Sequence, residues 1–370
     1  MAALLVAPRG WLVSCFAIPA WPLGREEEAR VARRCPGGVH RLMDPSRLPG
    51  FLAQRAVKAF LVVLAIVVCN FLLIHAAPGD PASVIAGQSG AADERFLAQL
   101  REQFGLDRPF HEQLWIYVKG VLTLDLGFSH RQQMPVWALI RDRLPATLLL
   151  TGAAFLFAIA AGITLGTLAA RRVGAWADSV ITVVALTFYA TPLFWVGLML
   201  VLVFSVWLEW LPSFGMAEVG VELHGLAFAL DVAKHLLLPA LTLGLFYLAV
   251  YARLTRATML EVADQDFVRT ARAKGVPEGR VLRAHVLRNA LLPVITFAGI
   301  QAGQLIGGSI LVETVFAWPG IGRLAFDALL ARDYAVLLGV FFCTSVMVVL
   351  FNLFTDLLYA VVDPRVEVGA

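Results

Sequence analysis

The most regular feature of the sequence is a series of uncharged apolar runs separated by polar segments. Leu144–Ala170 and Ser179–Leu208 contain no Asp, Glu, Lys or Arg, and each exceeds the ~20 residues that a helix needs to cross a bilayer. The six runs of this kind are Ala59–Ile74, Leu144–Ala170, Ser179–Leu208, His235–Ala252, Asn289–Val312 and Ala335–Thr355. In lipid, every backbone amide must be bonded within its own segment. The pattern therefore predicts an all-α integral membrane protein with six transmembrane helices.

The basic residues between these runs predict the orientation of the chain. Only 15% of the 370 residues are charged. The basic clusters are Arg47, Arg55 and Lys58 before the first run, Arg171 and Arg172 after the second, and eight Arg or Lys against four acids in 253–288. With six spans, all three clusters fall on one side, which the positive-inside rule makes cytoplasmic. We expect both termini to be cytoplasmic. The region 78–143 also holds seven basic residues, but the rule weakens in so long a loop.

The runs divide the chain into three parts. Residues 144–365 form the expected core transmembrane domain, and 51–143 hold the first span with a helical segment outside the membrane. Residues 1–50 contain one short apolar run with two prolines and no signal-peptide cleavage pattern. We expect 1–50 to be a disordered extension or an upstream over-translation with Met43 as the true start.

Several segments between the spans are expected on the outer face. Residues 91–105 read as an amphipathic helix, and 106–122 read as a second one with Asp107 as N-cap and Pro109 in its first turn. These helices either cover the ends of the spans or contact a partner. Between the last two spans, the Phe316/Trp318 pair and its Pro-Gly turn predict a re-entrant or surface helix at the membrane interface.

Two spans carry residues that break a helix or leave one of its faces without large side chains. Pro192 lies inside the third span, where it removes a backbone donor and should kink or break the helix. The fifth span carries a stripe of small residues, which are Gly299, Gly303, Gly307 and Ser309. Small residues at this spacing let helices pack closely. They could equally widen a central path for a solute.

The sequence contains no recognisable catalytic constellation. The dipeptide Gly-Lys never occurs, so there is no P-loop, and neither HExxH nor GxSxG is present. Ionisable residues are nearly absent from the runs, with Asp356 the main exception, whereas ion-coupled carriers usually hold such groups within their spans. We expect no cofactor, no metal and no nucleic-acid partner. Any uphill transport must draw its energy from another subunit.

The polar segment before the fifth span has its own helical pattern. Met259, Ala263, Phe267 and Ala271 recur every four residues and predict one apolar stripe over 255–274. The charges follow the helix dipole, with acids Glu261, Asp264 and Asp266 early and bases Arg269, Arg272 and Lys274 late. Gly275 is the expected stop, and Pro277 starts the next helix. A positive-inside anchor is the alternative, but an anchor needs no elbow.

This segment, "EVADQDFVRTARAKGVPEGRVLRAHVLRNALLPV", resembles the cytoplasmic EAA loop of ABC importer permeases of the dipeptide, oligopeptide and nickel family. Other motifs agree in order, among them "HAAPGDPA", "RLPATLLL", "FYATPLFWVG", "VETVFAWPGIGRLAFDALLARDYAVL" and "NLFTDLLYAVVDPR". The resemblance covers about 51–365. It departs from the general motif in two places: Arg269-Thr270-Ala271 stand for Glu-Ala-Ala, and the sixteen residues from Val276 to Leu291 make the gap to "LP" longer than in the general pattern.

The resemblance implies a type I ABC importer permease in a bacterial inner membrane. Such a permease pairs with a second, homologous permease, two cytoplasmic ATPase subunits and an extracytoplasmic solute-binding protein. The helix 261–275 would lie in a cleft of one ATPase, with Phe267 and Ala271 as apolar anchors. The solute is open among dipeptides, longer peptides, glutathione, nickel chelates and opines. A standalone channel, a secondary carrier and a membrane-embedded enzyme are the alternatives.

Overall fold

The structure is a computed structural model that describes residues 48–76, 107–129, 131–221 and 223–362. The chain divides into two units, and the packing below is that of Lys58–Asp363. In chain order the elements are α2 (Leu48–Ala76), α5 (Phe110–Leu122), β1 (Phe128–Ser129), β2 (Met134–Pro135), α6 (Val136–Arg171), α7 (Trp176–Ala190), α8 (Leu193–Val201), the π-helix η2 (Leu202–Trp207), α9 (Leu226–Ala263), α10 (Asp266–Ala273), α11 (Glu278–Arg280), the π-helix η3 (Val281–Leu287), α12 (Arg288–Val315), α13 (Ile321–Ala331) and α14 (Tyr334–Val362).

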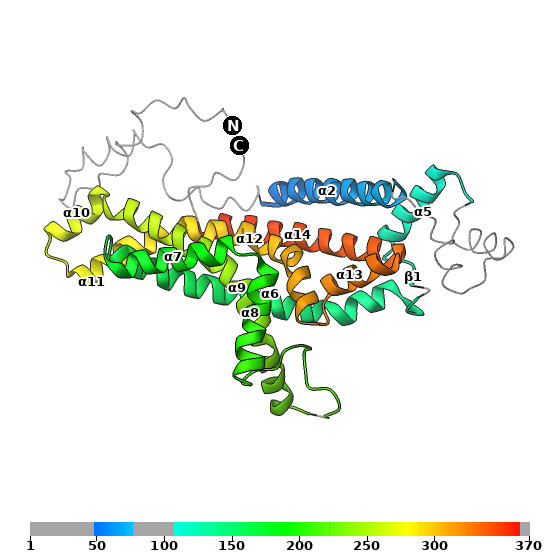
Figure 1. The fold of residues 1–370 in the computed structure, drawn as a ribbon. Helices are drawn as coiled ribbons and strands as arrows, with labels where there is room; N and C mark the ends of the chain where they lie inside the picture. The colour runs from blue at the N-terminus through cyan, green and yellow to red at the C-terminus, as the bar shows by residue number, and fades with distance from the viewer. Residues whose placement is uncertain (1–47, 77–106, 130, 222, 363–370) are drawn as a thin grey trace. The chain divides into compact units, whose positions relative to one another are not determined.

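Long helices make up the body of this unit. Helices α6, α9, α12 and α14 run alongside one another, with α10 and α11 at one end and β1 at the other (Figure 1). The 36 residues of α6 span about 54 Å, so its first turn and its last turn lie at opposite ends of this unit. Helix α9 crosses α6 closely, because a Cβ at Gly162 or Gly166 would overlap atoms of Tyr251, Ala252 or Thr255.

The predicted spans correspond to these helices. Among the described residues, five helices are long and apolar enough to cross a membrane, and there are six if α7 and α8–η2 form one bent span. The helices are longer than the uncharged runs. Helix α9 continues to Ala263 and α12 to Val315, so their charged ends remain helical.

The third span breaks at the predicted proline. Helix α7 ends at Ala190, Thr191 is extended, and Pro192 is the N-cap of α8. The two halves meet at 105°. Pro192 has no N–H to continue the helix, and its ring forces Thr191 away from the α region.

A buried carboxyl group joins α6, α12 and α13. Glu313, near the end of α12, is fully buried and accepts hydrogen bonds from Thr147 Oγ1 at 2.8 Å and Ser309 Oγ at 3.0 Å. Its other oxygen accepts the Arg323 amide at 2.9 Å, and the Gly322 amide also donates to the carboxyl group. Gly322 and Arg323 belong to the first turn of α13, so Glu313 satisfies amides that a helix start leaves unpaired.

The glycines around Glu313 leave room for its carboxyl group. A Cβ at Gly320 would overlap the Glu313 carboxyl, and one at Gly322 would lie 2.8 Å from its Oε2. Gly320 is the last residue of the predicted Trp-Pro-Gly turn, and Gly322 follows two positions later. The turn therefore allows α13 to start directly against the end of α12.

Three expectations need correction or fall outside the structure. Phe316 and Trp318 are fully buried rather than interfacial, and the Trp318 indole donates to the Ala146 carbonyl at 2.8 Å. The N-cap of α5 is Pro109 and not Asp107, with no side-chain cap. The expected helix 91–105 and residues 1–47 lie outside the described residues.

We expect Glu313→Ala to destabilise the protein, because the Thr147 and Ser309 hydroxyls and two α13 amides lose a buried acceptor. The loss should be on the order of 3 kcal/mol. Glu313→Gln keeps one acceptor oxygen and should lie between Ala and wild type. Unfolding temperatures of the detergent-purified protein measure this, with exposed Glu112→Ala as the control. Equal temperatures for Glu313→Ala and Glu112→Ala would contradict the role of this carboxyl group.

Candidate functional site

The predicted elbow lies between α9 and α12. The expected first helix through 255–274 is divided into two pieces, the end of α9 and α10. Helix α9 ends at Ala263, Gln265 is extended, and α10 begins at Asp266. After Gly275, Pro277 is the N-cap of α11, which continues through η3 into α12. We call residues 264–287 the coupling segment. The predicted restart at Pro277 is confirmed.

The break before α10 changes which residues face inward. The buried cluster contains Met259, Val262, Val268, Ala271, Val281, Val286 and Ala290, with Ala170 of α6 packed against it. Val268 is fully buried, while its neighbour Phe267 is 41% exposed. The predicted stripe was therefore wrong at Phe267, because two non-helical residues shift the register of α10, whereas Met259 and Ala271 are buried and Ala263 packs against the cluster.

The outer surface of the coupling segment is charged around one aromatic residue. Glu261, Asp264, Asp266, Arg269, Arg272 and Lys274 are all exposed. Phe267 lies among them, whereas Ala271 is buried in the chain's own cluster. Of the two expected apolar anchors, Ala271 cannot reach a partner and Phe267 can.

An ion pair closes the elbow. Arg272 donates to Glu278 at 2.8 Å from its NH2 and at 3.2 Å from its Nε. These hydrogen bonds to Glu278 raise the pKa of the Arg272 guanidinium above its ordinary value. Arg269 makes only a 3.8 Å contact with Asp266, and both side chains are largely exposed. Such a contact contributes little to stability.

Gly275 gives the elbow its direction. Its φ is +75°, in the left-handed region, and its amide donates to Arg272 O at 2.9 Å. A residue with a side chain is strained there. The helix ends before Gly275, as predicted.

The small residues of α12 differ among themselves. Gly299 lies against Thr355 of α14, whose hydroxyl donates to the Gly299 carbonyl at 2.9 Å. Gly303 faces Val348 and Asn352, while Gly307 has open space around it. Ser309 donates to Glu313. Close packing thus accounts for Gly299, where a Cβ would overlap Thr355, whereas a Cβ at Gly303 would make ordinary contacts and one at Gly307 none.

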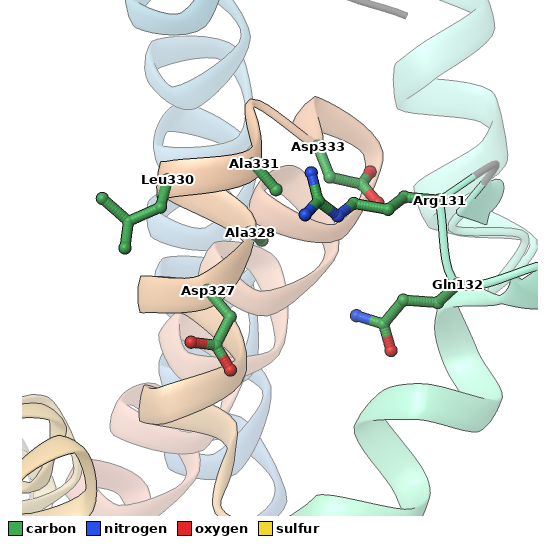
Figure 2. A pocket seen from close by; sticks show the side chains of 7 residues that line it. All are labelled: Arg131, Gln132, Asp327, Ala328, Leu330, Ala331 and Asp333. Carbon is green, nitrogen blue, oxygen red and sulfur yellow. The ribbon is translucent and has the colours of Figure 1, made fainter. Parts of the chain in front are cut away.

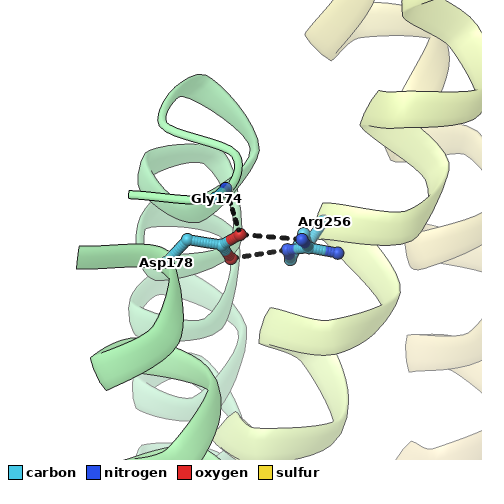
Figure 3. Close-up of polar contacts among 3 residues, drawn as sticks. All are labelled: Gly174, Asp178 and Arg256. Atoms are coloured by element: carbon cyan, nitrogen blue, oxygen red, sulfur yellow. Dashed lines mark hydrogen bonds and ion pairs between the residues drawn. The ribbon is translucent and has the colours of Figure 1, made fainter. Parts of the chain in front are cut away.

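Sequence reasoning missed an ion pair between α7 and α9. Arg256 donates to Asp178 through Nε at 2.7 Å and NH2 at 2.8 Å, and the Gly174 amide donates to the same carboxylate (Figure 3). Both residues lie outside the uncharged runs. The sequence pattern assigned no role to Asp178 and placed Arg256 in the expected helix 255–274. Only the fold brings them together.

At the N-terminal end of α6, a pocket of about 300 Å³ opens between the β1–β2 turn and α13. Arg131 and Gln132 face Asp327 and Asp333 across it (Figure 2). Asp333 accepts the Ser129 hydroxyl, which ties the turn to the start of α14. Its lining combines one basic and two acidic side chains with the apolar side chains of Ala328, Leu330 and Ala331.

These features are those of a helical membrane protein with a packed polar segment between two of its spans. Residues 162–368 match the family described as the binding-protein-dependent transport system inner membrane component, and 48–151 match the N-terminal part of such components. The chain belongs to this family. It is a permease subunit of an ABC importer, a multi-pass protein of the bacterial inner membrane, and has the predicted type I importer permease fold.

Curated relatives agree over most of the chain. The dipeptide transport system permease DppB of Escherichia coli K12 is 41% identical over 334 residues, which are 86% of this chain and 98% of that one. DppB of Alkalihalophilus pseudofirmus is 38% identical, with 86% and 99% covered. The glutathione transport system permease GsiC of Salmonella choleraesuis is 40% identical over 317 residues, with 86% and 98% covered.

Solved structures include an amino acid ABC transporter with histidines, 16% identical, covering 60% of this chain and 92% of that one at a TM-score of 0.45. An inward-facing MetNI methionine ABC transporter is 18% identical, covering 60% and 95% at the same TM-score.

We expect Gly275→Ala to loosen the elbow, because a side chain at φ +75° costs about 1 kcal/mol. Hydrogen–deuterium exchange of α10 should speed up about fivefold, the factor that corresponds to this energy. Gly279→Ala is the matched control, since Gly279 is helical and neither glycine has a neighbour within 4 Å of an added Cβ. Equal exchange in the two variants would show that the positive φ is not needed.

Proposed function

We propose that this permease imports peptides or a related small solute and that its coupling segment receives the motion of an ATPase. The exposed Phe267, surrounded by charges on a helix held by the buried cluster, is the observation that carries this proposal. A groove that takes such a helix binds the apolar anchor, while the charges fix its register. The chain itself supplies no ATP hydrolysis on this proposal.

The coupling segment is suited to transmit force because it has its own core. Val268 and Ala271 of α10 pack with Met259 and Val262 of α9 and with Val281 of η3. A push on α10 therefore reaches α9 and α12 together. We infer that these helices rock as one body and that the coupling segment and both termini face the cytoplasm.

The exposed apolar side chains of the spans support contacts with lipid and with a second, homologous permease. Examples are Phe60, Leu61, Leu73, Leu156 and Val183. In this arrangement the translocation path runs between the two permeases, each driven by one of two ATPase subunits. The bend at Pro192 and the open space at Gly307 are the features that favour this path.

The pocket near α13 supports docking of the solute-binding protein. It lies at the end of α6 opposite the coupling segment, where Arg131 and Asp327 are exposed and can meet charges of a partner. The relatives act in dipeptide and glutathione transport, which favours a short peptide as the solute. Selectivity would reside mainly in the binding protein.

The coupling role predicts that Phe267→Asp abolishes ATP-driven uptake in vesicles while the protein still inserts, because a carboxylate cannot enter an apolar groove. The ATPase subunits should also no longer co-purify. Phe267→Leu keeps an apolar side chain and should retain both. Wild-type uptake in Phe267→Asp would mean that α10 is not the coupling helix.

A further inference from the structure

The Asp178–Arg256 pair stands where the first half of the broken span meets the helix that leads to the coupling segment. Asp178 is in the first turn of α7, and its side chain is only 8% exposed. Arg256 is near the end of α9, and its side chain is 31% exposed. The two nitrogens of the guanidinium bind the two carboxylate oxygens side by side. This bidentate geometry is the strongest and most directional that such a pair adopts.

Helix α7 has few other attachments. Of its 15 residues, only Ala177, Asp178 and Ala185 are buried. Near its other end, Tyr189 stacks on Phe246 and lies 5.2 Å under the Arg253 guanidinium, both from α9. Ala177 and the Asp178–Arg256 pair are therefore the buried contacts at the start of α7, which also packs against α6.

The pair also lies on a continuous route through the chain. Beyond Arg256, α9 places Met259 and Val262 in the cluster that holds α10. Beyond Asp178, α7 runs to the bend at Pro192. A displacement of α10 thus reaches α9 through apolar packing. It passes to α7 through the ion pair at one end and the Tyr189 contacts at the other.

We propose that Asp178 and Arg256 are positioning residues for transport, which make the start of α7 move together with the end of α9. This inference rests on the proposed function, because it assumes that an ATPase moves the coupling segment. The pair stays formed through the cycle. Its loss lets α9 move without α7, so that ATP is hydrolysed without moving solute.

The test uses the whole importer, purified through an affinity tag on this chain and reconstituted in liposomes. Uptake and ATP hydrolysis are measured for wild type, Asp178→Asn, Arg256→Gln and the double variant. Each single variant should lower the uptake per ATP hydrolysed roughly tenfold, the effect of losing one charge-assisted pair. The double variant should be no worse than either single one, because the residues act as a unit.

Two controls separate this role from general stability and charge. Arg256→Lys keeps the charge but not the fork and should be intermediate. Arg172→Gln removes a neighbouring exposed charge and should match wild type. Wild-type uptake per ATP in both single variants, or additive losses in the double variant, overturns the inference. Absence of ATP-driven uptake by wild type would instead overturn the proposed function.

A measurement on the wild-type ion pair covers the case in which the variants do not fold. Spin labels replace Trp176 on α7 and Ala257 on α9, both of which are exposed. The distance between them should be the same with and without a non-hydrolysable ATP analogue. A pair of labels on Trp176 and Arg280 of α11 serves as a comparison. A nucleotide-dependent change in the Trp176–Ala257 distance would show that α7 and α9 move separately.

Discussion

The burial of the Glu313 carboxyl group is the constraint on which the end of the structure around α13 depends. A carboxyl group removed from water must find donors, since burial without them costs several kcal/mol. Here two hydroxyls, from α6 and α12, and two amides of α13 supply them. The Glu313 carboxyl group also occupies the space in which a side chain at Gly320 or Gly322 would lie. Two helices that follow one another in the sequence, α12 and α13, are fixed to the distant α6 by a single group.

The other end of the molecule is organised by apolar packing and by the Asp178–Arg256 pair. The cluster around Val268 holds the coupling segment to α9 and α12, while the ion pair holds α7 to α9. Between the two ends lie the bend at Pro192 and the loosely packed Gly307. The proposed transmission of motion rests on these three features: the coupling segment at one end, the helices joined by Glu313 at the other, and the broken span between them.

The sequence predicted the spans well but not where the helices end. Uncharged runs identify segments that can lie in lipid, and they stop at the first charge. In the structure the helices continue past that charge, and Asp178, Arg256 and Glu313 each lie on such an extension. A rule that treats charge as a sign of solvent places these side chains outside the spans. The rule fails here because they are paired inside the protein. The aromatic pair Phe316 and Trp318 was misplaced for a related reason, since it packs against protein rather than at the membrane surface.

What the sequence by itself determined were the local and one-dimensional features: the apolar runs, the break at Pro192, the stop at Gly275 and the restart at Pro277. Each follows from residues that change the backbone or the solvation of their own segment. The tertiary structure decided which face of α10 is buried, which glycines of α12 touch a neighbour and which charges are paired. Those outcomes depend on two non-helical residues at 264–265 and on distant partners, such as Thr355 for Gly299, 56 positions away, and Arg256 for Asp178, 78 positions away. The helical pattern of a sequence contains no information on such breaks or on distant partners.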